Sequence, residues 1–253
     1  MLFSIIITTY NYERYIKKSV ESALNQDFAH KYEVIVIDDF SKDNTLQILD
    51  DYSSLVRINN NRNLCLEVSA NKAIKKAKGK YIVRLDADDY LRENFLSEMS
   101  KYIVSENVFY YSNYTTVSED GSCISLVNLL DFDRKEIESR GDFLATGTVY
   151  PKKLLLSIGM YCEENKNCGL ENYQLILKLM KNGCQGLHIK KNLFFYRKHS
   201  NSLSFKKFES IMNYGLKLAK NYGLSCYVIN QYHPYLSIKD MDNHPLACYK
   251  LFK

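Results

Sequence analysis

The sequence predicts an α/β protein with a mostly parallel sheet that helices cover on both faces, followed by a C-terminal helical extension. Two observations carry this prediction. Short apolar runs alternate with segments of helical periodicity through the first 115 residues, and continuous apolar strands are typical of a sheet that is buried on both faces. With 253 residues, 46% of them hydrophobic, the chain is long enough to bury one full core.

Strands and helices alternate in the first half of the chain. The apolar run at its start gives a first strand, and apolar side chains then recur every three or four residues, which predicts an amphipathic helix. Ser41 or Asp43 can cap the second helix, and Gly79 ends the third. The expected strands are residues 1–7, 32–37, 55–58, 81–85 and 108–111, and the expected helices are residues 13–25, 67–78, 95–103 and the segment that carries Leu46, Leu49 and Tyr52.

The pattern loosens after residue 115, where we expect an insertion and then further elements. Gly121 follows an aspartate and marks a turn, and the charged stretch at residues 131–142 predicts a loop or a short helix. The later elements are expected at residues 143–150, in a helix that ends at Gly159, in a helix at 171–181, in a strand at 193–196 and in a last helix at 205–222.

Acidic side chains follow two of the expected strands at the point where each strand ends. Asp38 and Asp39 follow the second strand, and Asp86, Asp88 and Asp89 follow the fourth. Because the carboxyl ends of parallel strands form the ligand-binding edge of an open sheet, we expect both groups to share one site. Carboxylates are the ligands that Mg²⁺ and Mn²⁺ prefer. The sequence therefore predicts a site for a divalent cation and a diphosphate, with a solvated acidic turn as the alternative.

Composition argues against several classes of protein. The formal net charge of +5 is short of the balance expected for nucleic-acid binding, and it suits an anionic ligand or a weak attraction to acidic lipid. No apolar stretch approaches the roughly 20 residues that cross a bilayer, and no basic lead-in or cleavage site precedes the first strand, so we expect a cytoplasmic protein. The first strand is not followed by a glycine-rich turn, which argues against a nicotinamide dehydrogenase or a nucleotidyltransferase.

Three motifs occur in the order and at the spacing of a known enzyme family. They are SIIITTYN at residues 4–11, VIDDFSKDNT at residues 36–45 and RLDADD at residues 84–89. They closely resemble the signatures of family 2 glycosyltransferases, and the resemblance continues weakly through residues 146–148 and 171–183 and recurs at 196–202. It implies a GT-A fold with a Rossmann-like sheet, a metal-dependent site for a nucleotide sugar, and transfer with inversion at the anomeric carbon.

The resemblance also implies which residues bind the nucleotide sugar. Thr8, Tyr10 and Asp39 would border the base and ribose, with Asp39 accepting a hydrogen bond from a uracil N3–H. Asp86 would lie near the ribose and the sugar. Asn71 matches a frequent asparagine of the family and either contacts the donor or caps a loop.

The resemblance also implies which residues bind the diphosphate and its metal ion. By position, Asp88 would ligate the Mg²⁺ or Mn²⁺ that bridges the two phosphates. His199 would complete the metal shell, or is a surface histidine in a polar loop. Arg197 would neutralise diphosphate charge, or is a solvated cation.

The catalytic pair departs from the family at one position. The family usually offers Glu-Asp at the start of the helix after the acceptor region, with the aspartate favoured as base, whereas this chain has Glu171 and Asn172. An amide cannot take the proton from an acceptor hydroxyl. Three interpretations stay open: Glu171 is the base, Asn172 is an engineered isosteric replacement, or the protein is a weak or inactive relative.

We therefore expect a glycosyltransferase domain at residues 1–204, with a nucleotide-binding half at 1–115 and an acceptor-side half at 116–204. The helical extension at 205–253 either packs on this domain or contacts a membrane surface. The expected function is transfer of a sugar from a nucleotide-sugar donor, which the resemblance implies is a UDP-sugar, to a hydroxyl of a glycan or lipid-linked glycan in bacterial surface polysaccharide synthesis. The alternative is a non-catalytic nucleotide-binding or scaffold protein with the same fold.

Overall fold

The computed structural model describes residues 1–140, 146–200 and 208–224. Its first half is a parallel sheet, as the apolar runs predict. β1 (Phe3–Thr9) is buried along its whole length and lies between β2 (Glu33–Asp38) and β4 (Tyr81–Asp86), and β3 (Val56–Asn59) pairs with β2. The helices that connect these strands and follow β4 are α1 (Ile16–Leu24), α2 (Thr45–Asp50), α3 (Leu66–Lys76) and α4 (Phe95–Tyr102).

The second half makes the sheet mixed. β8 (Val149–Pro151) pairs antiparallel with β4 and with β6 (Val108–Val117), and β9 (Gln185–Arg197) runs parallel to β6. β5 (Tyr90–Leu91) and β7 (Cys123–Val127) add antiparallel edges to β9 and β6. Among the residues that the structure describes, four strand pairings are parallel and four are antiparallel, so the expectation of a mostly parallel sheet holds only for the first half.

Most of the later helices lie where the sequence places them. The charged stretch contains α5 (Arg134–Arg140), and α6 (Lys152–Ser157) and α7 (Glu171–Lys181) follow. The segment expected at 143–150 contributes the start of β8, and residues 143–145 lie outside the described residues. β5 and β7 were not predicted. β5 has only two residues, and β7, although its sequence CISLV is apolar, follows the turn at Gly121 in the region where an insertion is expected, and it is almost wholly exposed.

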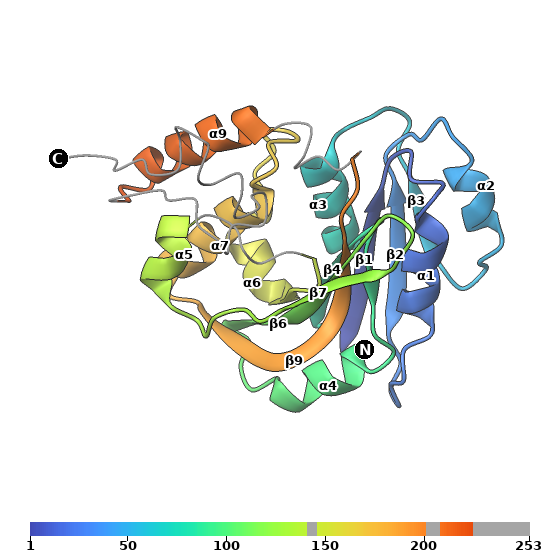
Figure 1. Cartoon of the computed structure of the whole chain (residues 1–253), viewed down its shortest axis with the longest axis horizontal. Helices are drawn as coiled ribbons and strands as arrows, with labels where there is room; N and C mark the ends of the chain where they lie inside the picture. Colours follow the sequence, from blue (N-terminus) through green and yellow to red (C-terminus); the bar gives the residue numbers. More distant parts are fainter. Residues whose placement is uncertain (141–145, 201–207, 225–253) are drawn as a thin grey trace.

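Helix α9 (Phe208–Asn221) packs on the domain (Figure 1). Ile211, Leu218 and Ala219 are buried and belong to the same hydrophobic cluster as the sheet, and the Tyr214 hydroxyl donates a hydrogen bond to Gln174 Oε1 of α7 at 3.1 Å. The packing alternative is therefore supported for this helix, while the rest of the expected extension lies outside the described residues. None of the helices in the described part of the chain is long and apolar enough to cross a bilayer.

Candidate active site

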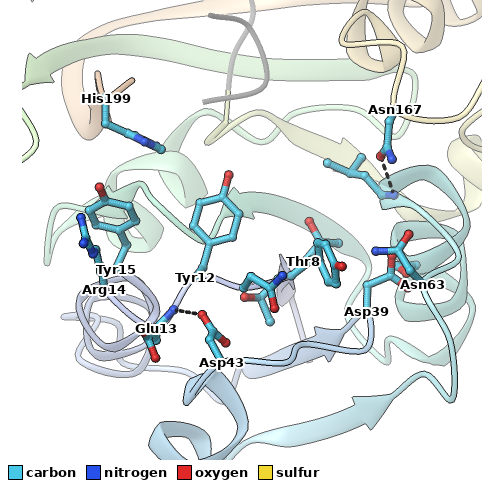
Figure 2. Close-up of a pocket in the computed structure, with 15 residues that line it drawn as sticks. Thr8, Tyr12, Glu13, Arg14, Tyr15, Asp39, Asp43, Asn63, Asn167 and His199 are labelled. Atoms are coloured by element: carbon cyan, nitrogen blue, oxygen red, sulfur yellow. Dashed lines mark hydrogen bonds between the residues drawn. The ribbon is translucent and has the colours of Figure 1, made fainter. Parts of the chain in front are cut away.

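A cavity of about 770 Å³ opens at the carboxyl ends of the parallel strands (Figure 2). The strand register explains why polar groups meet there, because Thr8 lies beside Asp86 and Thr9 lies beside Asp38. The cavity wall comes from the end of β1 and the β1–α1 loop, the loop after β2, the start of α3 with the residues before it, a loop before α7, and His199 of the 196–202 motif. Its residues are Thr8, Thr9, Tyr10, Asn11, Tyr12, Glu13, Arg14, Tyr15, Asp39, Asp43, Asn63, Leu66, Ser69, Asn167 and His199.

The two loops that follow β1 and β2 are tied together by hydrogen bonds. Asp38 is buried, and its Oδ2 accepts from the backbone N–H groups of Phe40 at 3.0 Å and Ser41 at 2.9 Å. The Ser41 hydroxyl accepts from the backbone N–H of Asn11 at 2.9 Å, and the Asn11 side chain accepts from the backbone N–H of Lys42 at 2.7 Å. Asp38 therefore orients this loop and does not line the cavity.

Asp39 lines the cavity and fixes the loop before α3. Its Oδ1 accepts from Asn60 Nδ2 and from the Leu64 backbone N–H, and its Oδ2 accepts from the Cys65 backbone N–H, each at 2.8 Å. A carboxylate has about four acceptor positions, so one acceptor position of Asp39 is left for a ligand. Thr8 and Tyr10 line the same cavity, with Tyr10 42% exposed.

Asp88 and His199 are in direct contact. His199 Nε2 lies 2.9 Å from Asp88 Oδ2, and the imidazole side chain is only 1% exposed. His199 Nδ1 and Asp89 Oδ2 are both buried without a hydrogen-bond partner in the described part of the chain. Burial, reinforced by Asp88 and Asp86, raises the pKa of the Asp89 carboxyl. A cation bound here would stabilise the closely spaced carboxylates of Asp86, Asp88 and Asp89.

The donor set fits a divalent cation. The Asp88 carboxylate suits Mn²⁺ or Mg²⁺, which usually retain water or phosphate oxygens as further ligands, and the His199 imidazole, a ligand typical of transition metals, favours Mn²⁺ of the two. A second group of possible ligands lies elsewhere: the donor atoms of Glu67, Cys168 and Glu171 lie within 4.8 Å of one another.

Tyr12 is a cavity residue that the sequence reasoning missed. Its ring makes an edge contact with the His199 ring at a centroid distance of 6.4 Å. Burial raises the pKa of its hydroxyl strongly, with further contributions from Asp88, Asp86 and Asp89. The phenol therefore stays protonated and can donate a hydrogen bond beside the acidic cluster.

Arg197 is held by backbone carbonyl groups. Its Nε donates to the Asp88 carbonyl at 2.9 Å, and its Nη1 donates to the carbonyls of Ser118 and Glu119 at 3.2 and 2.7 Å. It lines a neighbouring cavity of about 520 Å³ and not the one described above. The structure thus places the Arg197 charge next to the acidic cluster, with most of its donors already used.

Asn71 lies outside the lining of the 770 Å³ cavity and holds the loop before α7. Its Nδ2 donates to the Tyr161 carbonyl at 2.9 Å and to Glu163 Oε1 at 2.8 Å, and its Oδ1 accepts from the Tyr161 backbone N–H at 3.0 Å. The side chain is buried. Asn71 therefore fixes the backbone at Tyr161, which agrees with the alternative that it caps a loop.

Arg84 joins the acidic cluster to the catalytic pair, and it was not among the expected site residues. Its Nε and Nη2 donate to Asp86 Oδ1 at 3.1 and 2.8 Å, and its Nη1 donates to Glu171 Oε1 at 2.9 Å and to Asn172 Oδ1 at 2.6 Å. The Tyr161 hydroxyl also donates to Asn172 Oδ1, at 3.2 Å. The available signal was a cation inside the otherwise apolar strand 81–85.

Comparison with known proteins identifies the family of this chain. The family model of Glycosyl transferase family 2 matches residues 4–152. The chain belongs to this family. Over 226 residues it is 29% identical to the UDP-Glc:alpha-D-GlcNAc-diphosphoundecaprenol beta-1,3-glucosyltransferase WfaP of Escherichia coli, covering 83% of each chain.

A second relative is the poly(ribitol-phosphate) beta-N-acetylglucosaminyltransferase TarS of Staphylococcus aureus. It is 35% identical over 111 residues, which is 41% of this chain but only 19% of the length of TarS. The matched part of this family 2 chain therefore spans about a fifth of the length of that relative.

Solved structures show the same fold at low sequence identity. The structure of TarS 1–349 in complex with UDP has a TM-score of 0.68 at 23% identity and covers 88% of this chain and 65% of that one. The mannosyltransferase PcManGT from Pyrobaculum calidifontis, in complex with GDP-Man and Mn²⁺, has a TM-score of 0.67 at 15% identity, covering 87% and 64%. The α/β fold of GT-A type that the sequence predicts is confirmed.

Proposed function

We propose that this family 2 glycosyltransferase moves a sugar from a UDP-linked donor to a hydroxyl of a glycan or lipid-linked glycan in the synthesis of a bacterial surface polysaccharide. The observation that carries the proposal is the placement of Asp39 after β2 and of Asp86 and Asp88 at the end of β4, on either side of β1 and beside a cavity of about 770 Å³. That volume lies within the range of small-molecule sites. The names of WfaP and TarS support a glycan acceptor, and WfaP and the TarS complex support UDP.

The nucleotide would bind at the end of β1. Thr8 and Tyr10 would border the base and ribose, and the free acceptor position of Asp39 would receive the uracil N3–H. Asp86 would face the ribose and the sugar, and Arg197 would act on the diphosphate through its charge. Asp88 and His199 would hold Mn²⁺ or Mg²⁺, and when bound the ion neutralises charge that develops on the departing diphosphate.

Glu171 is the proposed base. It is 9% exposed at the first turn of α7, and Arg84 occupies its Oε1. Glu171 would take the proton from the acceptor hydroxyl as the oxygen forms its bond to the anomeric carbon. On the opposite face the bond from that carbon to the diphosphate breaks, and the electron pair leaves on the diphosphate oxygen. This single displacement inverts the anomeric centre.

The alternative is a non-catalytic or impaired protein that binds a nucleotide with the same fold. One observation favours it: Asn172 stands where the family usually has its base, and its Oδ1 already accepts two hydrogen bonds. Under this alternative, UDP binding in the presence of metal would be retained while no donor would be turned over. A cytoplasmic location, and peripheral membrane contact through the C-terminal extension, stay predictions.

A thermal-shift panel of UDP, GDP, CDP, TDP and ADP, each with Mn²⁺ and with chelator, tests the donor site without knowledge of the acceptor. Ligand at about 100 times its dissociation constant adds about 2.7 kcal/mol to the free energy of unfolding. For a chain of this size that corresponds to a shift of roughly 5–10 °C. We expect stabilisation by UDP only when metal is present, and no shift with any nucleotide would contradict the proposal.

A further inference from the structure

Arg84 occupies an unusual position for a cation. It lies in the central strand β4, is 5% exposed, and its guanidinium makes four hydrogen bonds to side chains. Burying a charge is costly unless it is paired. The pairing partners of Arg84 come from both sides of the proposed reaction, because Asp86 ends β4 next to the nucleotide cavity and Glu171 and Asn172 begin α7.

The bonds to Glu171 and Asn172 link parts of the chain that are far apart in sequence. Arg84 and Glu171 are separated by 87 residues, and one nitrogen, Nη1, serves both residues of α7. The opposite edge of the same planar group, Nε with Nη2, binds a single oxygen of Asp86. Because the guanidinium is rigid and planar, the positions of these carboxylates are fixed relative to one another.

The same contacts fix the orientation of the Asn172 amide. Burial raises the pKa of the Tyr161 hydroxyl to about 12, so at neutral pH this group keeps its proton and donates to Asn172 Oδ1. Arg84 donates to the same oxygen. An amide turned the other way would place its NH₂ group against two donors. The NH₂ group of Asn172 is therefore turned away from Arg84 and Tyr161.

We propose that Arg84 is a positioning residue of the transfer reaction. It holds the Glu171 carboxylate at a fixed position relative to Asp86 on the donor side, and it orients the Asn172 amide so that its NH₂ group can donate a hydrogen bond. The inference rests on the proposed function, because it assigns Glu171 as the base. In this arrangement Oε1 of Glu171 is engaged by Arg84 and Oε2 is left to take the proton of the acceptor. Asn172 then contributes a donor where the family usually has a carboxylate.

A purely structural role for Arg84 makes a different prediction. If Arg84 only neutralised buried carboxylates, a lysine would serve nearly as well, because it also carries one positive charge. A lysine has a single nitrogen and cannot bond Asp86 and the α7 pair with fixed geometry. Arg84→Lys therefore separates charge compensation from positioning.

The test compares Arg84→Lys, Glu171→Gln and the double variant with wild type. Release of UDP from UDP-glucose and from UDP-N-acetylglucosamine is measured in Mn²⁺, together with UDP affinity by calorimetry. We expect Arg84→Lys to lower kcat about 10- to 100-fold, the loss typical of a small misplacement, with the donor KM and UDP affinity within about threefold. Arg92→Lys, a half-buried arginine that packs over the Phe195 ring outside the site, is the matched control and should leave both unchanged.

The double variant shows whether Arg84 acts through Glu171. If it does, the double variant should be no slower than Glu171→Gln alone, whereas multiplied losses would overturn the inference, as would full kcat in Arg84→Lys. Full activity of Glu171→Gln would instead overturn the proposed base, and a wild-type chain that binds no UDP would overturn the proposed function itself. If the lysine variant does not fold, Arg84→Gln replaces it in the comparison with the double variant only, because glutamine also removes the charge that lysine keeps.

Discussion

The imidazole of His199 contacts the carboxylate of Asp88 although 111 residues separate them in the sequence. The short strand β5 explains how they meet. β5 begins directly after the acidic cluster and pairs antiparallel with the end of β9, so that Tyr90 faces Phe195. The chain before β5 and the chain after β9 therefore emerge side by side, and the two candidate metal ligands lie in hydrogen-bond contact.

Asp88→Ala should abolish metal-dependent binding of UDP. The substitution removes the charged ligand of the proposed cation site, so we expect UDP affinity in Mn²⁺ to fall by at least about 100-fold, beyond the 10- to 100-fold typical of outer-shell partners. His199→Ala should cost less, about 10- to 100-fold, because water can replace a neutral ligand. Calorimetric titration of UDP with Mn²⁺ and with chelator measures both effects.

Asp50→Ala is the matched control for these variants. Asp50 is an exposed carboxylate whose partner is the surface residue Arg57, and exposed ion pairs contribute little. Its UDP affinity should equal that of wild type. If Asp88→Ala also retains wild-type UDP affinity in Mn²⁺, the metal assignment is wrong.

The parallel half of the fold could be predicted because the apolar residues of its strands indicate that these strands are buried. β1, β2 and β4 consist mainly of apolar residues, and each strand is buried along nearly its whole length. The strand register places the aspartates at the ends of β2 and β4 on the same edge of the sheet. Thr8, Tyr10 and Asp39 accordingly line one cavity, as the motifs indicated.

The rest depends on contacts between distant segments, which local patterns do not encode. β9 begins at Gln185 and not at residue 193, because its first part pairs with β6 while exposing several side chains. Arg84 carries no local sign of its partners, since Glu171 and Asn172 reach it only through the placement of α7. Asn71 bonds to the backbone of Tyr161, 90 residues further along the chain, and the sequence of its own helix does not indicate this contact.

Cys65→Gly should stabilise the protein. Cys65 precedes α3 with φ 76° and ψ 163°, a backbone region that only glycine adopts without strain, at a cost to other residues of about 1–3 kcal/mol. Glycine adds an entropic cost of about 0.5–1 kcal/mol in the unfolded chain. We therefore expect the free energy of unfolding to rise by about 1–2 kcal/mol, measured by urea denaturation.

Cys65→Ala separates backbone strain from loss of the thiol. Alanine also lacks the sulfur but keeps the Cβ atom that causes the strain, so this variant should show no gain. Equal stabilisation by alanine and glycine would mean that the thiol, and not the backbone conformation, is the source. The hydrogen bond from the backbone N–H of residue 65 to Asp39 is available in all three proteins.

Glu67→Gln should make stability less dependent on pH. Burial raises the pKa of Glu67, Glu171 adds to the shift, and the Asn167 backbone N–H opposes it. The folded state then binds more protons than the unfolded state, so the stabilising contribution is complete below the ordinary pKa of about 4.3 and is lost as the pH rises through the folded pKa.

A glutamine at position 67 cannot ionise but can still accept the Asn167 hydrogen bond. The variant should therefore be more stable than wild type at pH 7, and the difference should vanish near pH 4. Urea denaturation at both pH values measures this, with the exposed Glu93→Gln as a control that should change stability little at either pH. A Glu67→Gln variant that is less stable at pH 7 would show that the ionised carboxylate is stabilising.

Asn172→Asp tests which residue of the pair can act as the base. An aspartate is isosteric and can accept the hydrogen bonds from Arg84 and Tyr161 through one oxygen, as Asn172 does, so we expect a folded protein with UDP affinity within about threefold of wild type. If Glu171 is the base, the second carboxylate adds no new proton acceptor that the reaction needs. UDP release should then rise by no more than about threefold.

A missing base at position 172 would give a different result. General-base catalysis contributes about 10²- to 10⁴-fold, so a gain of about 100-fold or more in Asn172→Asp would assign the base to this position and identify the present sequence as an impaired enzyme. Asn172→Ala is the control, because it removes the amide without adding a carboxylate. If Asn172 serves as a hydrogen-bond donor, both Asn172→Ala and Asn172→Asp should lose activity, because neither alanine nor an ionised aspartate has an N–H to donate.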